Sequence, residues 1–227
     1  DADLDLAVNG IAAGIFPAGG QSCISGSRLL VHRDVIDDFT DRLVSVVKKA
    51  RVGDPHDPKT QIGPMANRPQ YERVLQCIAD AESAGHRLLL DGRSSCRDTG
   101  YYIGPTIFSD VPNDSDLAQH EVFGPVVSTE AWDTEEEVIQ TANATVYGLA
   151  AGVWSGDVAR AMRMAEQIEA GTVYINNYFN AATQSPVGGF KQSGYGRENG
   201  WEGMRCYLQT RSVWLSTNPH QPDPFSD

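Results

Sequence analysis

The sequence predicts an α/β fold: an open, mostly parallel twisted sheet with helices on both faces. The order of the expected elements supports this. Up to Tyr178, short apolar runs typical of buried strands alternate with longer segments whose apolar residues recur at helical spacing. Alternation of this kind is typical of parallel strands connected by covering helices. The chain has 227 residues, which is enough to bury a substantial core.

The expected elements follow one another in a regular order along the chain. Helices are predicted at residues 1–12, 35–50, 70–84, 134–145 and 157–171, each with apolar residues on one face. Asp34, Thr134 and Asp157 are expected to cap three of these helices. Strands or extended segments are predicted at residues 28–32, 87–92, 101–108, 125–132, 148–156 and 172–178.

The pattern changes after Tyr178. Residues 179–203 are rich in glycine and show almost no periodicity, which in a compact domain is typical of a functional loop or a linker. The apolar segment "YLQTRSVWL" within residues 206–218 is predicted to form a strand. The last residues, 219–227, are expected to be a disordered tail.

Composition argues against several functional classes. The formal net charge of −12 disfavours nucleic acid or an anionic membrane surface as partner, because both attract basic patches. No apolar run approaches the roughly 18 residues of a membrane helix, and the opening "DADLDLAV" does not resemble a secretory signal. The cysteines form neither a C-x-x-C pair nor a zinc-type spacing. We therefore predict a cytoplasmic protein with reduced thiols and no metal site.

Cys23 is the first candidate for chemistry. It lies in "GGQSCISGSR", among small residues that leave a thiol accessible and let backbone N–H groups approach a developing oxyanion. An accessible thiolate would be a nucleophile. The alternative is an inert cysteine of the core, and this sequence offers no local Cys-His pair that would indicate a hydrolase.

A second candidate is the stretch "QHEVFGPVV". If both side chains face a cleft, Glu121 can accept hydrogen bonds from ribose hydroxyls while Phe123 packs on a flat ring. The alternative is a surface glutamate and a core phenylalanine.

The third stretch is "SPVGGFKQSGYGREN". Its glycines indicate unusual backbone angles or close contacts, but it matches neither common phosphate-binding motif. Lys191 and Arg197 are candidate anion ligands, and a purely structural loop is the alternative.

Taken together, the three stretches resemble motifs of the aldehyde dehydrogenase superfamily. The family's G-Q-x-C-x-x-x-S-R motif is similar to "GQSCISGSR", its E-[IV]-F-G-P-V motif to "EVFGPV", and its P-F-G-G-x-K-x-S-G-x-G-R-E motif to "PVGGFKQSGYGRE". The order and spacing also match, and the resemblance covers roughly residues 1–215.

The resemblance implies oxidation of an aldehyde to a carboxylic acid with NAD(P)+. In the family, the cysteine thiolate attacks the aldehyde, the thiohemiacetal passes hydride to the cofactor, and water hydrolyses the thioester. Cys23 matches the nucleophile and Glu121 the ribose ligand, while Phe123 matches the residue that packs near the nicotinamide. A further cofactor contact is expected at Gln70. The aldehyde tunnel is expected to involve Ser22, Ile24, Asn177, Tyr178, Ala181 and Val187.

The sequence departs from the family at two points. Val187 stands where the family often has phenylalanine, so no substrate preference carries over. Family enzymes are about twice this length, enough for a cofactor domain and a catalytic domain. The E-L-G-G-K motif that supplies the family's general base, the asparagine of the oxyanion hole and most of the dinucleotide-binding fold do not occur in these residues.

The resemblance therefore implies a catalytic domain at residues 1–205 and an oligomerisation strand at 206–218, with the N-terminal dinucleotide-binding domain absent. We expect the isolated chain to be weakly active or inactive, with neither NAD nor NADP tightly bound. Its expected partners are a small-molecule aldehyde and further copies of the chain. Two alternatives remain: a non-catalytic self-associating module, and a slow thiol esterase that needs no cofactor.

Overall fold

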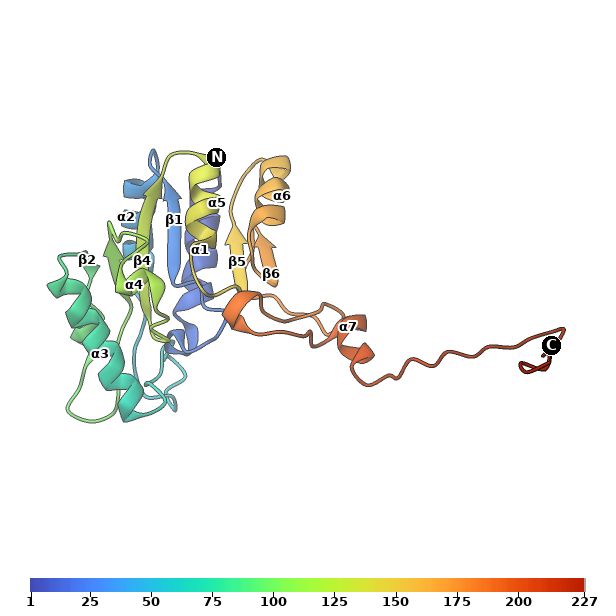
Figure 1. The fold of residues 1–227 in the computed structure, drawn as a ribbon. Helices are drawn as coiled ribbons and strands as arrows, with labels where there is room; N and C mark the ends of the chain where they lie inside the picture. The colour runs from blue at the N-terminus through green and yellow to red at the C-terminus, as the bar shows by residue number, and fades with distance from the viewer. Residues whose placement is uncertain (227) are drawn as a thin grey trace.

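The computed structural model describes residues 1–226 and contains a four-stranded sheet. Its order is β1 (Arg28–His32), β4 (Val126–Trp132), β3 (Thr106–Ser109) and β2 (Arg87–Leu90) (Figure 1). The β1/β4 and β3/β4 pairs are parallel, whereas β2 pairs with β3 in the antiparallel direction. The predicted α/β fold with a mostly parallel sheet is therefore confirmed.

A second sheet contains two strands. β5 (Ala150–Val153) and β6 (Thr172–Ile175) are parallel to each other. Among the described residues, no hydrogen-bonded ladder connects this pair to the four-stranded sheet. The single sheet expected from the sequence is thus present as two pieces, with β1 and β5 at the edges next to the break (Figure 1).

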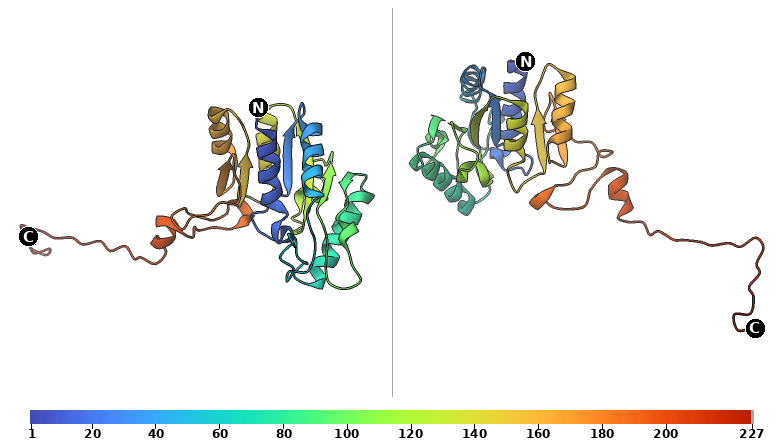
Figure 2. Two further views of the ribbon diagram at one scale, coloured as in Figure 1. Left: turned by 180° about the vertical axis from the view of Figure 1, so that it is seen from behind. Right: turned by 45° about the horizontal axis from the view of Figure 1, so that its top comes forward.

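Helices cover both faces of the sheet, as the alternation predicts. α1 (Leu4–Ile15) and α2 (Ile36–Val47) lie on one face, and α5 (Glu135–Asn143) and α6 (Val158–Gln167) lie on the other, as the opposite views of Figures 1 and 2 show. The remaining larger helix, α3 (Arg68–Ser83), packs with the short α4 (Asp116–Gln119).

Strand periodicity explains how the core divides between these helices. Successive side chains of a strand point to opposite faces. Leu29 accordingly packs in the cluster of α1 and α2, whereas its neighbour Leu30 packs against the cluster of α5 and α6. In β3, Ile107 belongs to the α1–α2 cluster and Phe108 to the cluster beneath α3 and α4.

Two of the three predicted helix caps are confirmed. The Thr134 side chain accepts from the Glu137 N–H at 3.2 Å, and the Asp157 carboxylate accepts from the first turn of α6. The cap predicted at Asp34 is wrong. α2 begins after Val35, which lacks a capping side chain, and the Asp34 N–H instead donates to Nδ1 of His32 at 3.2 Å.

The C-terminal part leaves the body of the molecule as an extended arm (Figures 1 and 2). It contains the short helix α7 (Gly200–Arg205), and no strand is assigned to residues 206–218. The strand predicted there does not form within this chain, because the segment has no neighbouring strand to accept its hydrogen bonds. Residues 219–226 are exposed.

Candidate active site

Cys23 lies in a tight turn just before β1. The Ser25 N–H donates to the Ser22 carbonyl at 3.0 Å, so Cys23 and Ile24 occupy the two central positions of the turn. Cys23 is exposed. The turn follows the 3-10 helix η1 (Pro17–Gly20), in which φ is positive at three successive residues. The sequence thus presents the thiol on a sharply bent loop, as its small residues predict.

The cysteine loop and the "EVFGPV" loop touch at two glycines. Gly20 has φ of +68°, and a Cβ placed there would lie 2.2 Å from the carbonyl oxygen of Gly124. Only glycine therefore satisfies both the backbone angle and the space at this position. The contact explains why two motifs separated by about a hundred residues meet at one site.

Glu121 and Phe123 lie two residues apart in one loop, and both side chains are exposed. Val122 between them is buried, whereas both neighbours are exposed. Phe123 has φ of +54°, an unusual value for a side chain of this size. This backbone is held from α3, because the Gln70 Nε2 donates to the carbonyls of Val122 and Phe123 at 2.9 Å each.

Glu121 has a perturbed carboxyl group. Partial burial raises its pKa, and the positive charge of Arg73 lowers it to a smaller extent. Arg73 also donates to the carbonyl of Val122 at 2.8 Å, so it helps to fix the loop. The hydroxyl of Tyr147 lies 3.5 Å from the Glu121 backbone N–H.

A groove of about 750 Å³ brings several of the predicted site residues together. Cys23 and Ile24 line it from the turn before β1, Glu121 from the loop before β4, and Tyr178 from the segment after β6. A thiol, a carboxylate and an aromatic wall thus share one cavity, although they come from widely separated parts of the chain.

Tyr178 fits among glycines. Cβ atoms added at Gly14 and Gly152 would lie 2.7 and 2.8 Å from its ring, and Gly26 also faces it. Burial raises the pKa of the Tyr178 phenol well above its usual range. Its ring is packed at an angle against Tyr174, with 4.9 Å between the centroids.

The other predicted site residues do not line the groove. Ser22 closes the cysteine turn, and Gln70 uses its amide on the Glu121 loop rather than presenting it to the groove. Val187 forms an isolated bridge with Glu198. Phe123, Asn177 and Ala181 are exposed outside the groove lining.

The glycine-rich stretch has a structural role. The Lys191 ammonium donates to the Asn143 carbonyl at 2.6 Å, at the end of α5, and pairs with Glu169 at 2.7 Å. Arg197 donates to the carbonyls of Gly189 and Gly196. Both cations are therefore engaged within the protein, which agrees with the alternative of a structural loop.

Two residues that organise the site were not predicted. Gln21 connects the cysteine loop to the next segment, because its Oε1 accepts from the Ala66 N–H at 2.9 Å. Arg73 lies one turn after Gln70 on α3 and binds the same loop. The helical spacing of Gln70 and Arg73 was available in the sequence, but their backbone partners were not.

Two further features are absent from residues 1–226. These residues contain no group of three or more His, Cys, Asp or Glu side chains that could hold a metal ion. No helix in the described part of the chain is both long and apolar enough to cross a membrane.

Comparison with known proteins identifies the family. The model of the aldehyde dehydrogenase family matches residues 1–213, which is most of the chain. The chain belongs to the aldehyde dehydrogenase family. It is 44% identical over 218 residues to a betaine aldehyde dehydrogenase of Brucella anthropi, and the match covers 95% of this chain and 45% of that protein.

Solved structures give the same assignment. An NAD-dependent aldehyde dehydrogenase from Sinorhizobium meliloti is 39% identical, with a TM-score of 0.95, and the match covers 100% of this chain and 45% of that one. An aldehyde dehydrogenase from Bacillus cereus, solved with NAD+, is also 39% identical, with a TM-score of 0.92 over 96% of this chain and 44% of that one. The chain thus spans slightly less than half the length of these relatives.

Proposed function

We propose that this chain carries the nucleophile-bearing part of an enzyme that oxidises an aldehyde to a carboxylic acid with NAD(P)+. In this reaction the Cys23 thiolate adds to the aldehyde carbon, and the oxygen takes a proton to give a thiohemiacetal. Removal of a hydride from that carbon, together with loss of the hydroxyl proton, leaves a thioester on the sulfur. Water then releases the acid and restores the thiol. The observation that carries the proposal is that Cys23 and Glu121 line the same groove.

The residues present fit the nicotinamide and ribose end of the cofactor. Glu121 offers a partly exposed carboxylate for ribose hydroxyls, and Phe123 offers an exposed ring for a flat aromatic group. When bound, the nicotinamide supplies the hydride acceptor. The chain's own contribution is to hold both side chains on one loop, through Gln70 and Arg73.

The same geometry supports low activity of the isolated chain. Lys191 and Arg197 are bonded internally, so neither is available to hold the cofactor phosphates without breaking those contacts. A positioned general base typically contributes about 10²–10⁴-fold to such a reaction, and the family's base motif does not occur in these residues. We expect little or no dehydrogenase turnover from the chain alone. The same expectation holds in the cytoplasm, where we expect the protein to be located.

An assay of the purified chain tests this proposal. Reduction of NAD+ and NADP+ is followed with betaine aldehyde, which the relatives' names suggest, and with several unrelated aldehydes. Release from an activated ester is followed in parallel without cofactor. Cys23→Ser should abolish any thiol-dependent reaction, whereas Cys206→Ser should leave it unchanged. Robust aldehyde oxidation by the isolated chain would contradict the expected inactivity, and activity retained in Cys23→Ser would exclude the nucleophile.

A specific observation also favours self-association. The arm carries Val213, Trp214 and Leu215 with 80, 94 and 85% of their surface exposed, in a segment without strand partners. Such an edge-forming apolar segment is a template for pairing with another chain. Light scattering should show a homo-oligomer that becomes smaller when the chain is truncated after Cys206. A strict monomer of the untruncated chain would rule this out.

A further inference from the structure

The backbone at the end of α5 receives one side chain from each of the three stretches singled out in the sequence. We call this backbone, residues 141–145, the α5 junction. Arg28 ends the cysteine stretch and donates to a carbonyl of the junction at 2.9 Å. Gln119, which opens the stretch of Glu121, donates to another at 2.9 Å, and Lys191 of the glycine-rich stretch donates to a third at 2.6 Å. Three segments that are far apart in the chain are thereby fastened to one place.

The electrostatics of a helix explain why cations gather there. The last carbonyls of a helix have no following turn to bind them, and the helix dipole makes this end negative. α5 has acidic residues at 135–137 in its first turn and no basic residue in its last turn. Arg28 and Lys191 therefore supply, from other elements, the positive charge that favours this end of the helix.

Arg28 and Gln119 are also joined to each other, through Asn113 in the loop after β3. The Arg28 guanidinium donates to the Asn113 side-chain oxygen at 2.5 Å, and the Asn113 carbonyl accepts from the Gln119 amide at 2.5 Å. The Asn113 N–H in turn donates to Glu130 of β4 at 3.2 Å, which anchors Asn113 to the larger sheet. Together with the α5 junction, these bonds form a closed ring of contacts.

The surroundings of Arg28 require an arginine. The residue is partly buried, and burial lowers the pKa of its guanidinium, which the negative charge of Glu130 opposes. A buried donor that loses its partner is costly, because water does not replace the bond. The planar guanidinium reaches two acceptors at fixed angles, which a lysine ammonium does not do. The ring of contacts therefore depends on this side chain in this geometry.

Both ends of the ring lead directly into the candidate site. Arg28 follows Cys23 by five residues and is the first residue of β1. Gln119 precedes Glu121 by two residues. Arg28 and part of the α5 junction also line the groove that contains Cys23 and Glu121. A shift of the ring would thus change the separation between the thiol and the carboxylate.

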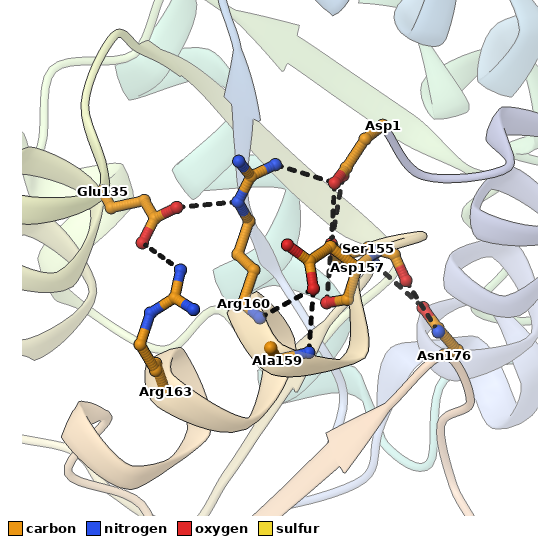
Figure 3. A network of polar contacts seen from close by, with 8 residues as sticks. All are labelled: Asp1, Glu135, Ser155, Asp157, Ala159, Arg160, Arg163 and Asn176. Atoms are coloured by element: carbon orange, nitrogen blue, oxygen red, sulfur yellow. Dashed lines mark hydrogen bonds and ion pairs between the residues drawn. The ribbon is translucent and has the colours of Figure 1, made fainter.

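The opposite end of α5 is held by a separate network of ion pairs (Figure 3). Glu135 accepts from Arg160 at 2.7 Å and pairs with Arg163 at 3.4 Å, and both arginines belong to α6. α5 has nine residues, so its two ends lie about 13 Å apart at a rise of about 1.5 Å per residue. None of these three side chains belongs to the motif stretches, so the network offers a matched control for the α5 junction.

We propose that Arg28 is a positioning residue, which sets the Glu121 loop relative to the cysteine turn through Asn113 and the α5 junction. This role rests on the proposed function, in which Cys23 binds the reacting carbon and Glu121 binds the cofactor ribose. Arg28 would then keep these two groups at a fixed separation without touching either ligand. The mechanical coupling itself is measurable without any reaction.

Hydrogen exchange at two amides tests the proposal in the 227-residue chain. The Ser25 N–H in the cysteine turn and the His120 N–H beside Glu121 donate to backbone carbonyls at 3.0 and 2.9 Å. Arg28→Met keeps a long side chain and removes its donors. We expect about fivefold faster exchange at both amides, although His120 belongs to the other loop. Gln119→Met should likewise accelerate exchange at Ser25, because coupling between two sites is reciprocal.

Two further variants separate this coupling from a general loss of stability. Glu135→Gln breaks the ion pairs at the other end of α5 and should leave exchange at Ser25 and His120 unchanged. The double variant of Arg28→Met and Gln119→Met should exchange no faster than the faster single variant, because both substitutions break the same ring.

Three results would overturn the proposal. Acceleration at Ser25 alone in Arg28→Met would mean that Arg28 stabilises only its own turn. Additive effects in the double variant would mean two independent contacts, and acceleration in Glu135→Gln would assign the effect to the stability of α5 as a whole. If Arg28→Met does not fold, the response of Ser25 to Gln119→Met decides. The proposed function fails separately, on the labelling rate of Cys23 in the unaltered chain, which these amides do not report.

Discussion

The four-stranded and two-stranded sheets differ in how completely their strands are buried. Every residue of β3 is buried, and so are the first four residues of β4, whereas β6 is only partly buried throughout and β5 buries Val153 alone. β3 and β4 have a strand on each side and helices on both faces. Each strand of the smaller sheet has one neighbour, and two-stranded sheets alone are marginal.

This difference shows where the candidate site lies. β1 forms the border of the larger sheet and is mostly only partly buried, and Cys23 lies just before it. Tyr178 follows β6 of the smaller sheet and reaches the same groove. The site therefore spans the less complete boundary of the molecule, while the well-packed sheet fixes the nucleophile and the Glu121 loop.

The largest expected effect comes from a matched pair of isoleucines. Ile107→Ala in β3 removes a side chain that is 0% exposed and should lower the free energy of unfolding by about 4 kcal/mol. Ile175→Ala in β6 removes a partly buried one and should cost about 1.5 kcal/mol. Urea denaturation of both variants measures the difference. Equal losses of unfolding free energy would contradict the view that the two sheets differ in burial.

A glycine pair tests the contact between the two motif loops. Gly20→Ala requires a side chain at positive φ and against the Gly124 carbonyl, so we expect a loss of about 3 kcal/mol. Gly63→Ala is the control, because an added Cβ there meets nothing within 4 Å. Thermal melts compare the two. If Gly20→Ala proved as stable as Gly63→Ala, the close contact would not hold the cysteine loop.

Two glutamine variants on α3 test whether that helix holds the Glu121 loop in place. Gln70→Ala removes both hydrogen bonds to the Glu121 loop and should cost about 1.5 kcal/mol. Gln76→Ala removes only an exposed contact with Asp80 and should cost about 0.3 kcal/mol. Exchange of the loop amides around Val122 should rise in the first variant only. Unchanged exchange in Gln70→Ala would mean that Arg73 alone fixes the loop.

The smallest expected effect is a pH dependence at Glu121. Burial raises the pKa of this carboxyl in the folded protein, so folding favours the protonated form. The contribution to stability is full below the unfolded pKa of about 4.3 and is lost as the pH rises through the folded value. Glu121→Gln should therefore melt slightly higher than the parent at pH 7, with no gain near pH 4. A lower melting temperature at pH 7 would contradict the sign.

Local patterns predicted most of the elements correctly. Thr134 and Asp157 cap their helices because a short polar side chain before an amphipathic run is sufficient for that role. Asp34 failed as a cap because α2 begins at Ile36, so that Val35 rather than Asp34 occupies the N-cap position. No strand is assigned to residues 206–218 in the single chain, since a strand needs a partner that the local sequence does not contain, and the oligomerisation strand stays a prediction.

The site was predictable to a lesser extent. Spacing and family motifs indicated Cys23, Glu121 and Tyr178, which line one groove. They did not reveal that Gln70 binds backbone carbonyls, because its partners lie 52 and 53 residues away along the chain. The break between the sheets was also invisible in the sequence, because β1 and β5 each resemble an ordinary buried strand.

The measurement that tests the central claim most directly is labelling of the native chain with a limiting amount of iodoacetamide, followed by peptide mapping. Cys23 and Cys206 are both exposed and form a matched pair, but the Cys206 thiol contacts the Glu202 carbonyl at 3.8 Å. Partial burial raises the pKa of Cys77, which should react slowest. We predict that Cys23 reacts at least tenfold faster than Cys206. A rate for Cys23 no higher than that of Cys206 would contradict the claim that this loop presents an activated nucleophile.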